Sequence, residues 1–223
     1  MRDMVITIDG PAGAGKTTVS RQLAGRLGYR YVDTGALYRG IALAAREKGV
    51  DAGDDAGLAA LCSGLTLELV VGPDGSRLLS GGVDISGRIR TPEISMMASA
   101  VSARPVVREF LLGLQRKMGQ DKRAVFEGRD TGTVVFPGAD VKFFLSAAVE
   151  ARALRRFKEL PPGAGLTLEQ VADDIRLRDH NDQTRSHAPL KPAEDAIMVD
   201  STNRTPDQVV DFMMEHIRGR SKT

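Results

Sequence analysis

Residues 8–18, IDGPAGAGKTT, constrain the fold more than any other stretch of this chain. Gly10, Gly15, Lys16 and Thr17 match the pattern G-x-x-x-x-G-K-[ST], placed between a short apolar run and a helical pattern. Glycines let the backbone curl so that successive N–H groups face phosphate oxygens, and the helix N-terminus adds partial positive charge. The stretch therefore predicts a strand, a phosphate-binding loop and a helix, which is how a parallel α/β fold begins.

We expect this loop to bind the phosphates of a nucleoside triphosphate. Lys16 would reach the β- and γ-phosphates of ATP, and the hydroxyl of Thr17 would ligate Mg²⁺. The predicted nucleotide-binding residues are Gly10, Pro11, Ala12, Gly13, Ala14, Gly15, Lys16, Thr17 and Thr18. Phosphate binding alone leaves the reaction and the acceptor undefined.

The composition is that of a soluble globular chain of 223 residues, 42% hydrophobic and 27% charged. Lys and Arg number 31 against 29 for Asp and Glu, so no global field attracts nucleic acid or a membrane. The single Cys62 excludes an internal disulfide and fits a reducing compartment. Neither a signal peptide nor an apolar stretch of ~18 residues is visible. We expect a cytoplasmic protein, and a monomer because no long apolar patch or heptad is evident.

Short apolar runs alternate with helical patterns along most of the chain. The predicted strands are MVITID, YRYVD, RAVFE, VKFFLS and AIMVD, and the helical patterns lie at 17–28, 36–49, 150–160, 167–186 and 205–218. This alternation predicts an α/β fold with five parallel strands, right-handed crossovers and flanking helices.

Two parts of the chain depart from this alternation. Residues 65–86 alternate in polarity around a GPDG turn, which predicts a small antiparallel insert outside the main sheet. Two helices broken at Pro105 follow the insert. PPGAG at 161–165 is predicted to be a mobile tip between two charged helices.

Charged residues recur at the carboxyl edge of the predicted sheet, where ligands of such folds bind. DTGALYRG follows the second strand, so Thr34 can cap the next helix while Tyr38 and Arg39 project from its first turns. EGRDTGTVVFP places Arg129 and Asp130 in a glycine-flanked loop after the third core strand. Each of these stretches also fits a simpler interpretation, a capped helix or a plain turn.

Further arginines lie on the two helices beside the predicted tip: Arg152, Arg155 and Arg156 on the first, and Arg178 and Arg185 with Asp182 on one face of the second. Alone, each group fits a solvated helix face. Together they suit two phosphorylated ligands, because like charges ~4 Å apart repel by about 4 kcal/mol at an effective dielectric of ~20. Arginine matches phosphate oxygens bidentately, and arginines on a lid arrive only when it shuts and excludes water. The pattern predicts a kinase that acts on a small phosphorylated acceptor.

Two other nucleotide-binding classes fit the sequence less well. A switch GTPase would carry a guanine-reading N-K-x-D motif, which is absent from the sequence. A motor or assembly ATPase would carry a long apolar strand ending in Asp, whereas RAVFE ends in Glu127.

Four stretches in this order resemble the bacterial cytidylate kinases: ITIDGPAGAGKTT, DTGALYR, EGRDTGTVVFP and RDHNDQTRSHAPL. The resemblance extends from Val5 to about Phe212 and includes the antiparallel insert. It implies a single P-loop kinase domain over 1–223, with a core at about 1–33, 109–150 and 186–223, a monophosphate-binding region at 34–108 and a lid at 151–185. It also implies that ATP phosphorylates CMP or dCMP with Mg²⁺, giving ADP and CDP or dCDP.

By matching position, the resemblance implies that the acceptor contacts Thr34, Tyr38, Arg39, Ser99, Arg108, Arg129, Asp130, Asp182 and Arg185. Ser99, Arg108 and Asp130 would read the cytosine edge, Arg129 and Arg185 would hold the acceptor phosphate, and Asp182 would bind the ribose. The predicted catalytic residues are Lys16, Arg129, Arg152, Arg156 and Arg178, with Arg178 also on the acceptor side and Arg155 a further lid cation.

The histidines show no metal-ligand spacing, so no metal besides Mg²⁺ is expected. His180, Asn181 and Gln183 depart from the residues common in relatives, and we interpret them as solvent-facing variation. Two alternatives stay open: a kinase for UMP, AMP or another small molecule, and a regulator that binds ATP without transferring phosphate.

Overall fold

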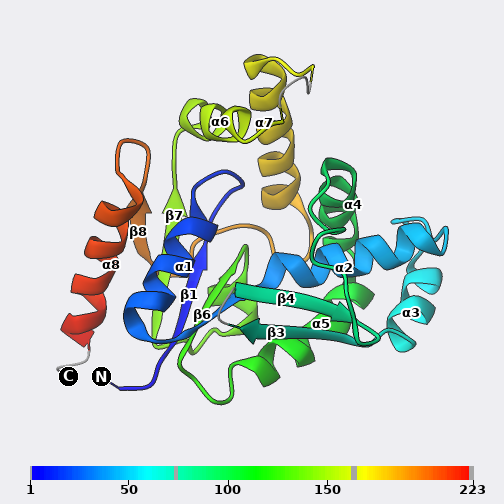
Figure 1. Cartoon of the computed structure of the whole chain (residues 1–223), viewed down its shortest axis with the longest axis horizontal. Helices are drawn as coiled ribbons and strands as arrows, with labels where there is room; N and C mark the ends of the chain where they lie inside the picture. The colour runs from blue at the N-terminus through cyan, green and yellow to red at the C-terminus, as the bar shows by residue number, and fades with distance from the viewer. Residues whose placement is uncertain (1, 73–74, 162–164, 221–223) are drawn as a thin grey trace. The chain divides into compact units, whose positions relative to one another are not determined.

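A computed structural model of the chain describes residues 2–72, 75–161 and 165–220 (Figure 1). The chain folds into two compact units. Unit 1 contains the chain up to Tyr29 and from Lys122 onward, and unit 2 contains Arg30–Asp121. Across the described residues, none of the helices combines the length and apolar character needed to cross a membrane.

Five parallel strands form the main sheet in the order β2-β6-β1-β7-β8, which confirms the predicted core. The strands are β1 (Val5–Asp9), β2 (Arg30–Asp33), β6 (Ala124–Gly128), β7 (Val141–Ser146) and β8 (Ile197–Asp200). All residues of β1 and β6 are buried, as expected for strands covered on both faces. The register pairs Asp9 of β1 with Gly128 of β6, so these two strands end side by side at the carboxyl edge.

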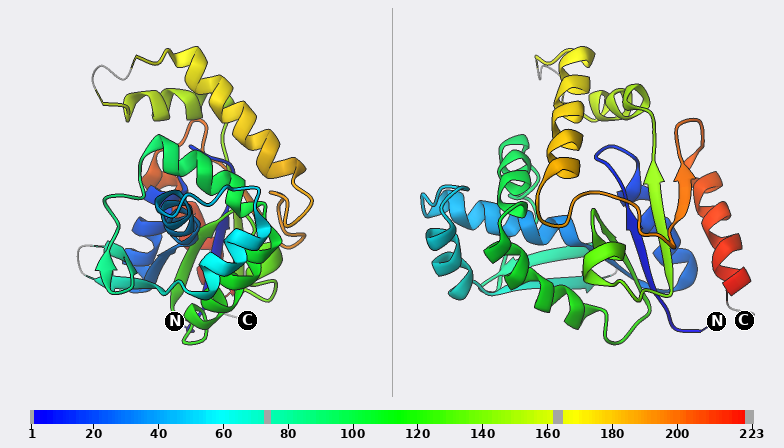
Figure 2. Two further views of the ribbon diagram at one scale, coloured as in Figure 1. Left: turned by 90° about the vertical axis from the view of Figure 1, so that its right-hand side faces the viewer. Right: turned by 180° about the vertical axis from the view of Figure 1, so that it is seen from behind.

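The helices of unit 1 are α1 (Lys16–Leu27), α6 (Val149–Lys158), α7 (Leu168–Thr184) and α8 (Pro206–Arg220), with a short π-helix, η1 (Thr131–Val135). Helix α1 packs against β6 and α8, and α6 packs against α7 (Figures 1 and 2). Gly28 ends α1 in the left-handed conformation at φ +65°, as predicted. Helix α7 begins with a capping box formed by Thr167 and Gln170.

Unit 2 contains α2 (Thr34–Glu47), α3 (Asp55–Ser63), α4 (Pro92–Ser102) and α5 (Pro105–Met118). Its antiparallel sheet has the order β3-β4-β5, with β3 (Leu67–Gly72), β4 (Gly75–Ser80) and β5 (Val83–Asp84). This confirms the antiparallel insert and the helix break at Pro105. Helix α2 packs against α4 and α5 around a core that includes Leu37, Ile41, Ile94 and Leu111.

The structure differs from the sequence-based expectation at three places. Helix α3 was not predicted, although Asp54 caps it by accepting the N–H of Gly57 at 2.9 Å. The N-cap of α2 is Asp33 and not Thr34, because the Asp33 carboxylate accepts the N–H of Ala36 at 3.1 Å and Thr34 is already helical. The predicted glycine-flanked loop with Arg129 and Asp130 continues into the π-helix η1, of which Asp130 is the N-cap. Parts of the predicted GPDG turn and PPGAG tip, residues 73–74 and 162–164, lie outside the described residues.

Candidate functional site

The glycine loop after β1 has a conformation that requires its glycines. Gly10 has φ +151°, and a Cβ added there would lie 1.9 Å from the carbonyl oxygen of Leu145. Gly15, the N-cap of α1, is left-handed at φ +88°. Lys16 begins the helix, and its Nζ donates to the carbonyl oxygen of Pro11 at 2.7 Å. The loop therefore passes against β7 and curls around the buried lysine.

Two further carbonyl oxygens of this loop are bound by side chains from outside it. Arg152 Nη1 donates to the carbonyl oxygen of Ala12 at 3.1 Å, and Ser201 Oγ donates to that of Ala14 at 2.9 Å. Both donors belong to buried residues. Binding the carbonyl oxygens fixes the peptide planes of the loop, and fixed planes allow backbone N–H groups to form a concave anion site.

Lys16 lies in a strongly positive environment. Its pKa is lowered from 10.5 to about 7, first by burial and then by the positive charges of Arg129 and Arg178. The carboxylates of Glu127 and Asp9 act in the opposite direction. The structure thus brings together three cations from separate segments of unit 1. A bound anion would relieve their mutual repulsion and favour the charged lysine.

Thr17 and Glu127 form a pair of oxygen donors beside the loop. The Thr17 hydroxyl donates to Glu127 Oε1 at 2.9 Å, although the residues are 110 positions apart in the chain. Glu127 lies near the carboxyl end of β6 and is largely buried. Oxygen ligands of this kind suit Mg²⁺, which in such loops is held by a hydroxyl and an acidic residue at the end of a neighbouring strand.

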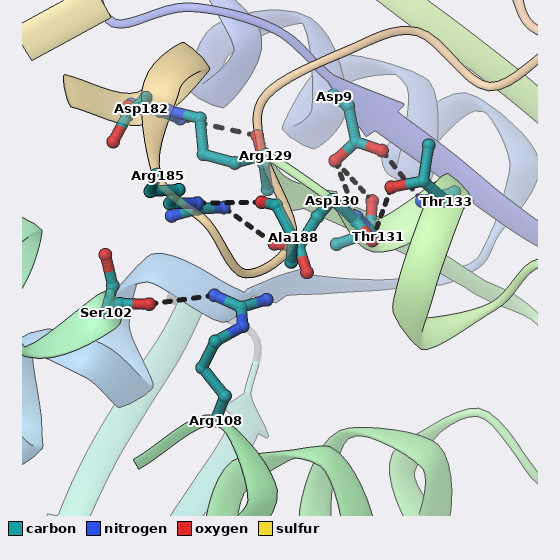
Figure 3. A network of polar contacts seen from close by, with 12 residues as sticks. Asp9, Ser102, Arg108, Arg129, Asp130, Thr131, Thr133, Asp182, Arg185 and Ala188 are labelled. Carbon is teal, nitrogen blue, oxygen red and sulfur yellow. Dashed lines mark hydrogen bonds and ion pairs between the residues drawn. The ribbon is translucent and has the colours of Figure 1, made fainter. Parts of the chain in front are cut away.

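Two Arg–Asp pairs lie close together beside the end of β6 (Figure 3). Arg129 Nε lies 2.9 Å from Asp182 Oδ2, and Arg185 Nη2 lies 3.4 Å from Asp130 Oδ1. Arg185 also donates from Nε to the carbonyl oxygen of Ala188 at 2.7 Å. The segment that follows β6 and the end of α7 are therefore joined by charge as well as by hydrogen bonds.

The charge on Asp182 is maintained by its arginine neighbours. Burial alone would raise the pKa of this carboxyl group. The positive charges of Arg129, Arg178 and Arg185 outweigh burial, so the pKa of Asp182 is lower than its usual value. Asp182 is ionised at neutral pH and is surrounded by the arginines predicted to bind an acceptor.

The three arginines of α6 have different environments. Arg152 is buried, and its Nη1 lies 2.6 Å from Asp179 Oδ2 on α7. Arg155 donates to Ser201, from Nη1 to the hydroxyl oxygen at 3.1 Å and from Nη2 to the carbonyl oxygen at 2.5 Å. Arg156 is about half exposed and pairs with Glu159 in the same helix at 3.5 Å. The structure therefore brings Arg152 to the glycine loop and leaves Arg156 on an exposed side of α6.

In unit 2, the predicted acceptor residues lie at the start of α2 and around α4 and α5. Arg39 Nη2 lies 2.7 Å from Asp33 Oδ2, so the residue that caps α2 also orients this arginine. Arg108 stacks over the ring of Tyr38, with Cζ 5.7 Å from the ring centroid. Arg108 also donates to the carbonyl oxygen of Ser102 at 3.0 Å (Figure 3). Ser102 in turn donates to the carbonyl oxygen of Ser99 at 2.8 Å.

Several residues of these networks were not predicted from the sequence, among them Asp9, Asp33, Glu127, Asp179 and Ser201. Asp9, Asp33 and Glu127 lie at or near the carboxyl ends of strands, so the position of an acidic residue there was an available signal. Asp179 and Ser201 carried no such signal, since their partners are 27 and 187 positions away. His180, Asn181 and Gln183 are exposed, as expected for solvent-facing variation.

Comparison with known proteins places these features in a family. The cytidylate kinase family model matches residues 6–219. A cytidylate kinase of Citrifermentans bemidjiense is 48% identical over 218 residues, 97% of this chain and 94% of the relative. A cytidylate kinase of Geobacter sulfurreducens is 47% identical over 222 residues, 99% of this chain and 95% of the relative.

Among solved structures, a shikimate kinase from Bacteroides thetaiotaomicron matches with a TM-score of 0.51 and 14% identity. The match covers 97% of this chain and 99% of that one. At this identity the likeness establishes the fold alone, that of a P-loop kinase.

Proposed function

Because the chain belongs to the cytidylate kinase family, we propose that it transfers the γ-phosphoryl group of ATP to CMP or dCMP, giving ADP and CDP or dCDP. The observation that carries the proposal is that Arg129 and Arg178 lie close enough to the buried Lys16 to lower its pKa. Two phosphorylated ligands repel each other, and three cations close together in one unit are suited to offset that repulsion.

On the donor side, we assign the ATP phosphates to the loop from Gly10 to Thr18 and to Lys16. The support is the fixed loop conformation, with Arg152 and Ser201 binding its carbonyl oxygens. In this proposal, ATP displaces the Lys16 ammonium from the carbonyl oxygen of Pro11 and takes it as a phosphate ligand. Arg152, Arg156 and Arg178 are the proposed transfer-site cations, and Arg156 reaches the site only if the lid moves.

The Thr17–Glu127 pair fits a magnesium ion. Both groups supply oxygen, they lie 2.9 Å apart, and they adjoin the lysine that would contact the phosphates. Among the described residues there is no cluster of three or more His, Cys, Asp or Glu side chains arranged to hold a metal. Thr17, supported by Glu127, would therefore hold Mg²⁺ jointly with nucleotide phosphates, and the ion would neutralise charge on the transferred group.

On the acceptor side, unit 1 supplies Arg129 and Arg185 for the phosphate of CMP and Asp182 for its ribose. In unit 2, we assign Thr34, Tyr38 and Arg39 to contact with the acceptor, and Ser99 and Arg108 to the cytosine. In unit 1, Asp130 is also assigned to the cytosine. The support is that these arginines already have fixed partners: Asp182, Asp130, Asp33 and the ring of Tyr38. An arginine held in place loses less freedom when a phosphate binds.

The reaction needs no strong base in this proposal. An oxygen of the acceptor phosphate attacks the γ-phosphorus while the bond to the β-phosphate oxygen breaks and ADP leaves. Positioning and charge neutralisation supply most of the catalysis, and a single arginine that reaches the transferred group can be worth about 10³–10⁵ in rate.

The acceptor is tested by initial rates of ADP formation with CMP, dCMP, UMP and AMP at equal concentration. CMP and dCMP should be faster than the other two by a wide margin. A faster rate with UMP or AMP would overturn the assignment. ATP hydrolysis that does not depend on CMP would instead indicate a nucleotide-binding regulator.

The division between donor and acceptor sides is tested by three substitutions. Arg39→Ala and Arg185→Ala should mainly raise the KM for CMP. Lys16→Ala should reduce turnover and leave CMP binding measurable. Equal loss of ATP and CMP binding in all three variants would contradict the division.

We also propose that the protein acts as a cytoplasmic monomer with no nucleic-acid partner. The net formal charge of +2 gives no strong field for nucleic acid, and one chain supplies every residue assigned above. Light scattering at micromolar concentration should give a mass near 23.9 kDa. A dimer mass would contradict the assignment.

A further inference from the structure

Asp9, the last residue of β1, accepts three hydrogen bonds from the segment that follows Asp130 (Figure 3). Asp9 Oδ1 accepts the N–H of Thr131 at 2.9 Å and the hydroxyl of Thr131 at 2.7 Å. Asp9 Oδ2 accepts the N–H of Gly132 at 2.7 Å. The carboxylate is 4% exposed, so these three contacts take the place of water. Asp9 therefore joins the strand that leads into the glycine loop to the segment that carries Arg129 and Asp130.

A carboxylate is the side chain that these donors require. All three hydrogen bonds are donated to Asp9, and both of its oxygens are used. An asparagine has one carbonyl oxygen, and its NH₂ group would meet either a donor from Thr131 or the N–H of Gly132. Burial raises the pKa of Asp9, and the hydrogen bonds from Thr131 and Gly132 act against that rise.

The contact also leaves no space for adjustment. A Cβ added to Gly132 would lie 2.8 Å from Thr7 Oγ1 and 3.3 Å from Asp9 Oδ2, so the backbone of η1 packs directly on β1. On the other side of Asp9, Gly10 packs directly on the backbone of β7. Asp9 thus lies between two close contacts, one of the Gly132 backbone with side chains of β1 and one of Gly10 with the backbone of β7.

Hydrogen bonds within η1 fix the backbone of the same segment as well. The carbonyl oxygen of Asp130 accepts the N–H of Val134 at 2.9 Å and that of Val135 at 3.3 Å. The N–H groups of the next two residues, Thr131 and Gly132, are bound by Asp9. The peptide planes on both sides of Thr131 therefore have one orientation, and the side chains of Arg129 and Asp130 leave the backbone from that fixed frame. A π-helix at such a place is typical of functional sites.

We propose that Asp9 is a positioning residue that sets the Arg129–Asp130 segment, and through it the acceptor nucleotide, against the donor loop. This inference rests on the proposed function, which assigns Arg129 and Asp130 to the acceptor. Asp9 itself touches no reacting atom. Asp9 ends β1, and the ATP-binding loop begins at the next residue, Gly10. The hydrogen bonds of Asp9 therefore hold the groups proposed to bind CMP in a fixed position relative to β1 and the start of that loop. Misplacement of such groups by about 1 Å can cost roughly a hundredfold in rate.

The first test is Asp9→Asn, with CMP and ATP binding measured separately by calorimetry. The substitution should weaken CMP binding about tenfold or more, because Arg129 and Asp130 are then no longer held in the position that binds the acceptor. ATP binding should change by less than about threefold, since Asp9 contributes no contact to the phosphates in this proposal and has the weakest effect on the pKa of Lys16 among the neighbouring charges. Unchanged CMP binding, or equal weakening of both nucleotides, would overturn the proposal.

Asp140→Asn is the matched control. Asp140 Oδ2 accepts the N–H of Val5 at 2.8 Å, at the amino end of the strand that Asp9 ends. It is a second largely buried carboxylate bound to β1, and it has no assigned role in nucleotide binding. Loss of stability without selective loss of CMP binding is expected. Selective loss of CMP binding in this variant too would show that general strain in β1 explains the effect and would overturn the proposal.

Thr131 keeps the proposal falsifiable if Asp9→Asn does not fold. Thr131→Val removes one of the three donors and keeps the shape of the side chain, whereas Thr131→Ser keeps the hydroxyl. The valine variant should weaken CMP binding severalfold and the serine variant should restore it. In the Asp9→Asn/Thr131→Val double variant the losses should not add, because both act through one contact. Normal CMP binding with valine, or no recovery with serine, would overturn the proposal.

Hydrogen exchange separates failure of this proposal from failure of the proposed function. Asp9→Asn should increase amide exchange at 129–132 relative to Asp140→Asn, whatever nucleotide the protein prefers. If wild-type protein turned over UMP and not CMP, the proposed function would fail while the exchange result still tested the role of Asp9. If exchange at 129–132 did not change, the positioning role would fail even in an active CMP kinase.

Discussion

Arg129 and Asp182 form an ion pair in which Nε lies 2.9 Å from Oδ2, with the side chains 20% and 6% exposed. They are 53 positions apart, one after β6 and the other near the end of α7. The positive charges of Arg178 and Arg185 also lower the pKa of Asp182, so this one carboxylate interacts with three arginines. The pair holds part of the proposed acceptor site together before any nucleotide binds.

Replacing Asp182 should destabilise the protein more than its single ion pair suggests. Asp182→Asn removes the buried carboxylate that pairs with Arg129 and interacts with the charges of Arg178 and Arg185. The free energy of unfolding at pH 7 should fall by about 3 kcal/mol, measured by urea denaturation. Asp173→Asn is the control on the same helix, because Asp173 pairs with Arg176 on an exposed face and its loss should cost about 0.5 kcal/mol or less.

The contribution of Asp182 should also depend on pH in a defined direction. The pKa of Asp182 is lower in the folded protein than in the unfolded chain. Its stabilisation is therefore fully present above the unfolded value of about 3.9 and is lost as the pH falls through the folded value. The difference between wild type and Asp182→Asn should be constant from pH 5 to 8 and shrink below pH 4. A difference that increases on acidification would contradict this account.

ATP binding should be coupled to uptake of a proton by Lys16. The pKa of Lys16 is about 7 without ligand, and anionic phosphates favour the charged form. Uptake should be small at pH 5.5, about half a proton at pH 7 and close to one at pH 8.5. Calorimetry of ATP binding in buffers with different ionisation enthalpies measures this uptake directly.

The measurement at pH 8.5 decides the origin of the proton, because the terminal phosphate of ATP, with a pKa of about 6, is already ionised there. In Lys16→Arg the uptake at pH 8.5 should disappear, since arginine stays charged at this pH. Undiminished uptake in that variant would assign the proton to another group.

Asp33 and Asp54 provide a matched pair in unit 2. Asp33 caps α2 and binds Arg39, whereas Asp54 caps α3. Alanine at either position should cost about 1 kcal/mol of stability through the lost cap. Only Asp33→Ala should raise the KM for CMP, by about fivefold, because Arg39 loses its orientation. Steady-state kinetics of both variants would check this, and a lower KM in Asp33→Ala would mean that Asp33 competes with the acceptor phosphate.

Two glycines of unit 1, one in the donor loop and one within α1, should respond oppositely to alanine. At Gly10 a Cβ would overlap the carbonyl oxygen of Leu145, so Gly10→Ala should lower the melting temperature sharply or prevent folding. At Gly25, within α1, a Cβ would meet nothing within 4 Å. Gly25→Ala should raise the melting temperature by about 2–4 °C, the result of up to about 1 kcal/mol of added stability. A fall in Gly25→Ala, or a normal value in Gly10→Ala, would contradict the backbone geometry described above.

The five strands and most helices were predictable because their signals are local. An apolar run such as VITID, or a period of 3.6 residues ended by Gly28, is visible within a dozen positions. Helix α3 was missed because it has nine residues, too few for a clear period, and Asp54 is one of several acidic residues before it. The sequence does not identify the N-cap of α2, because Thr34 and Asp33 are both residue types that cap helices well. Only the extended backbone at Asp33 shows that Asp33 is the cap.

The sequence by itself determined the fold class, the family and the types of residue that could bind phosphate, because short contiguous stretches of the chain are enough to predict each of them. The tertiary structure decided how those residues are paired: Thr17 with Glu127, Arg152 with Asp179, and Asp9 with Thr131 and Gly132. Such pairs join positions 27 to 123 apart, and no local period encodes a partner at that distance. The pairs of Glu127 and Asp9 form because the carboxyl ends of neighbouring parallel strands meet at one edge. The pair of Arg152 and Asp179 forms because α6 packs against α7, and in every case buried polar groups need partners that replace water.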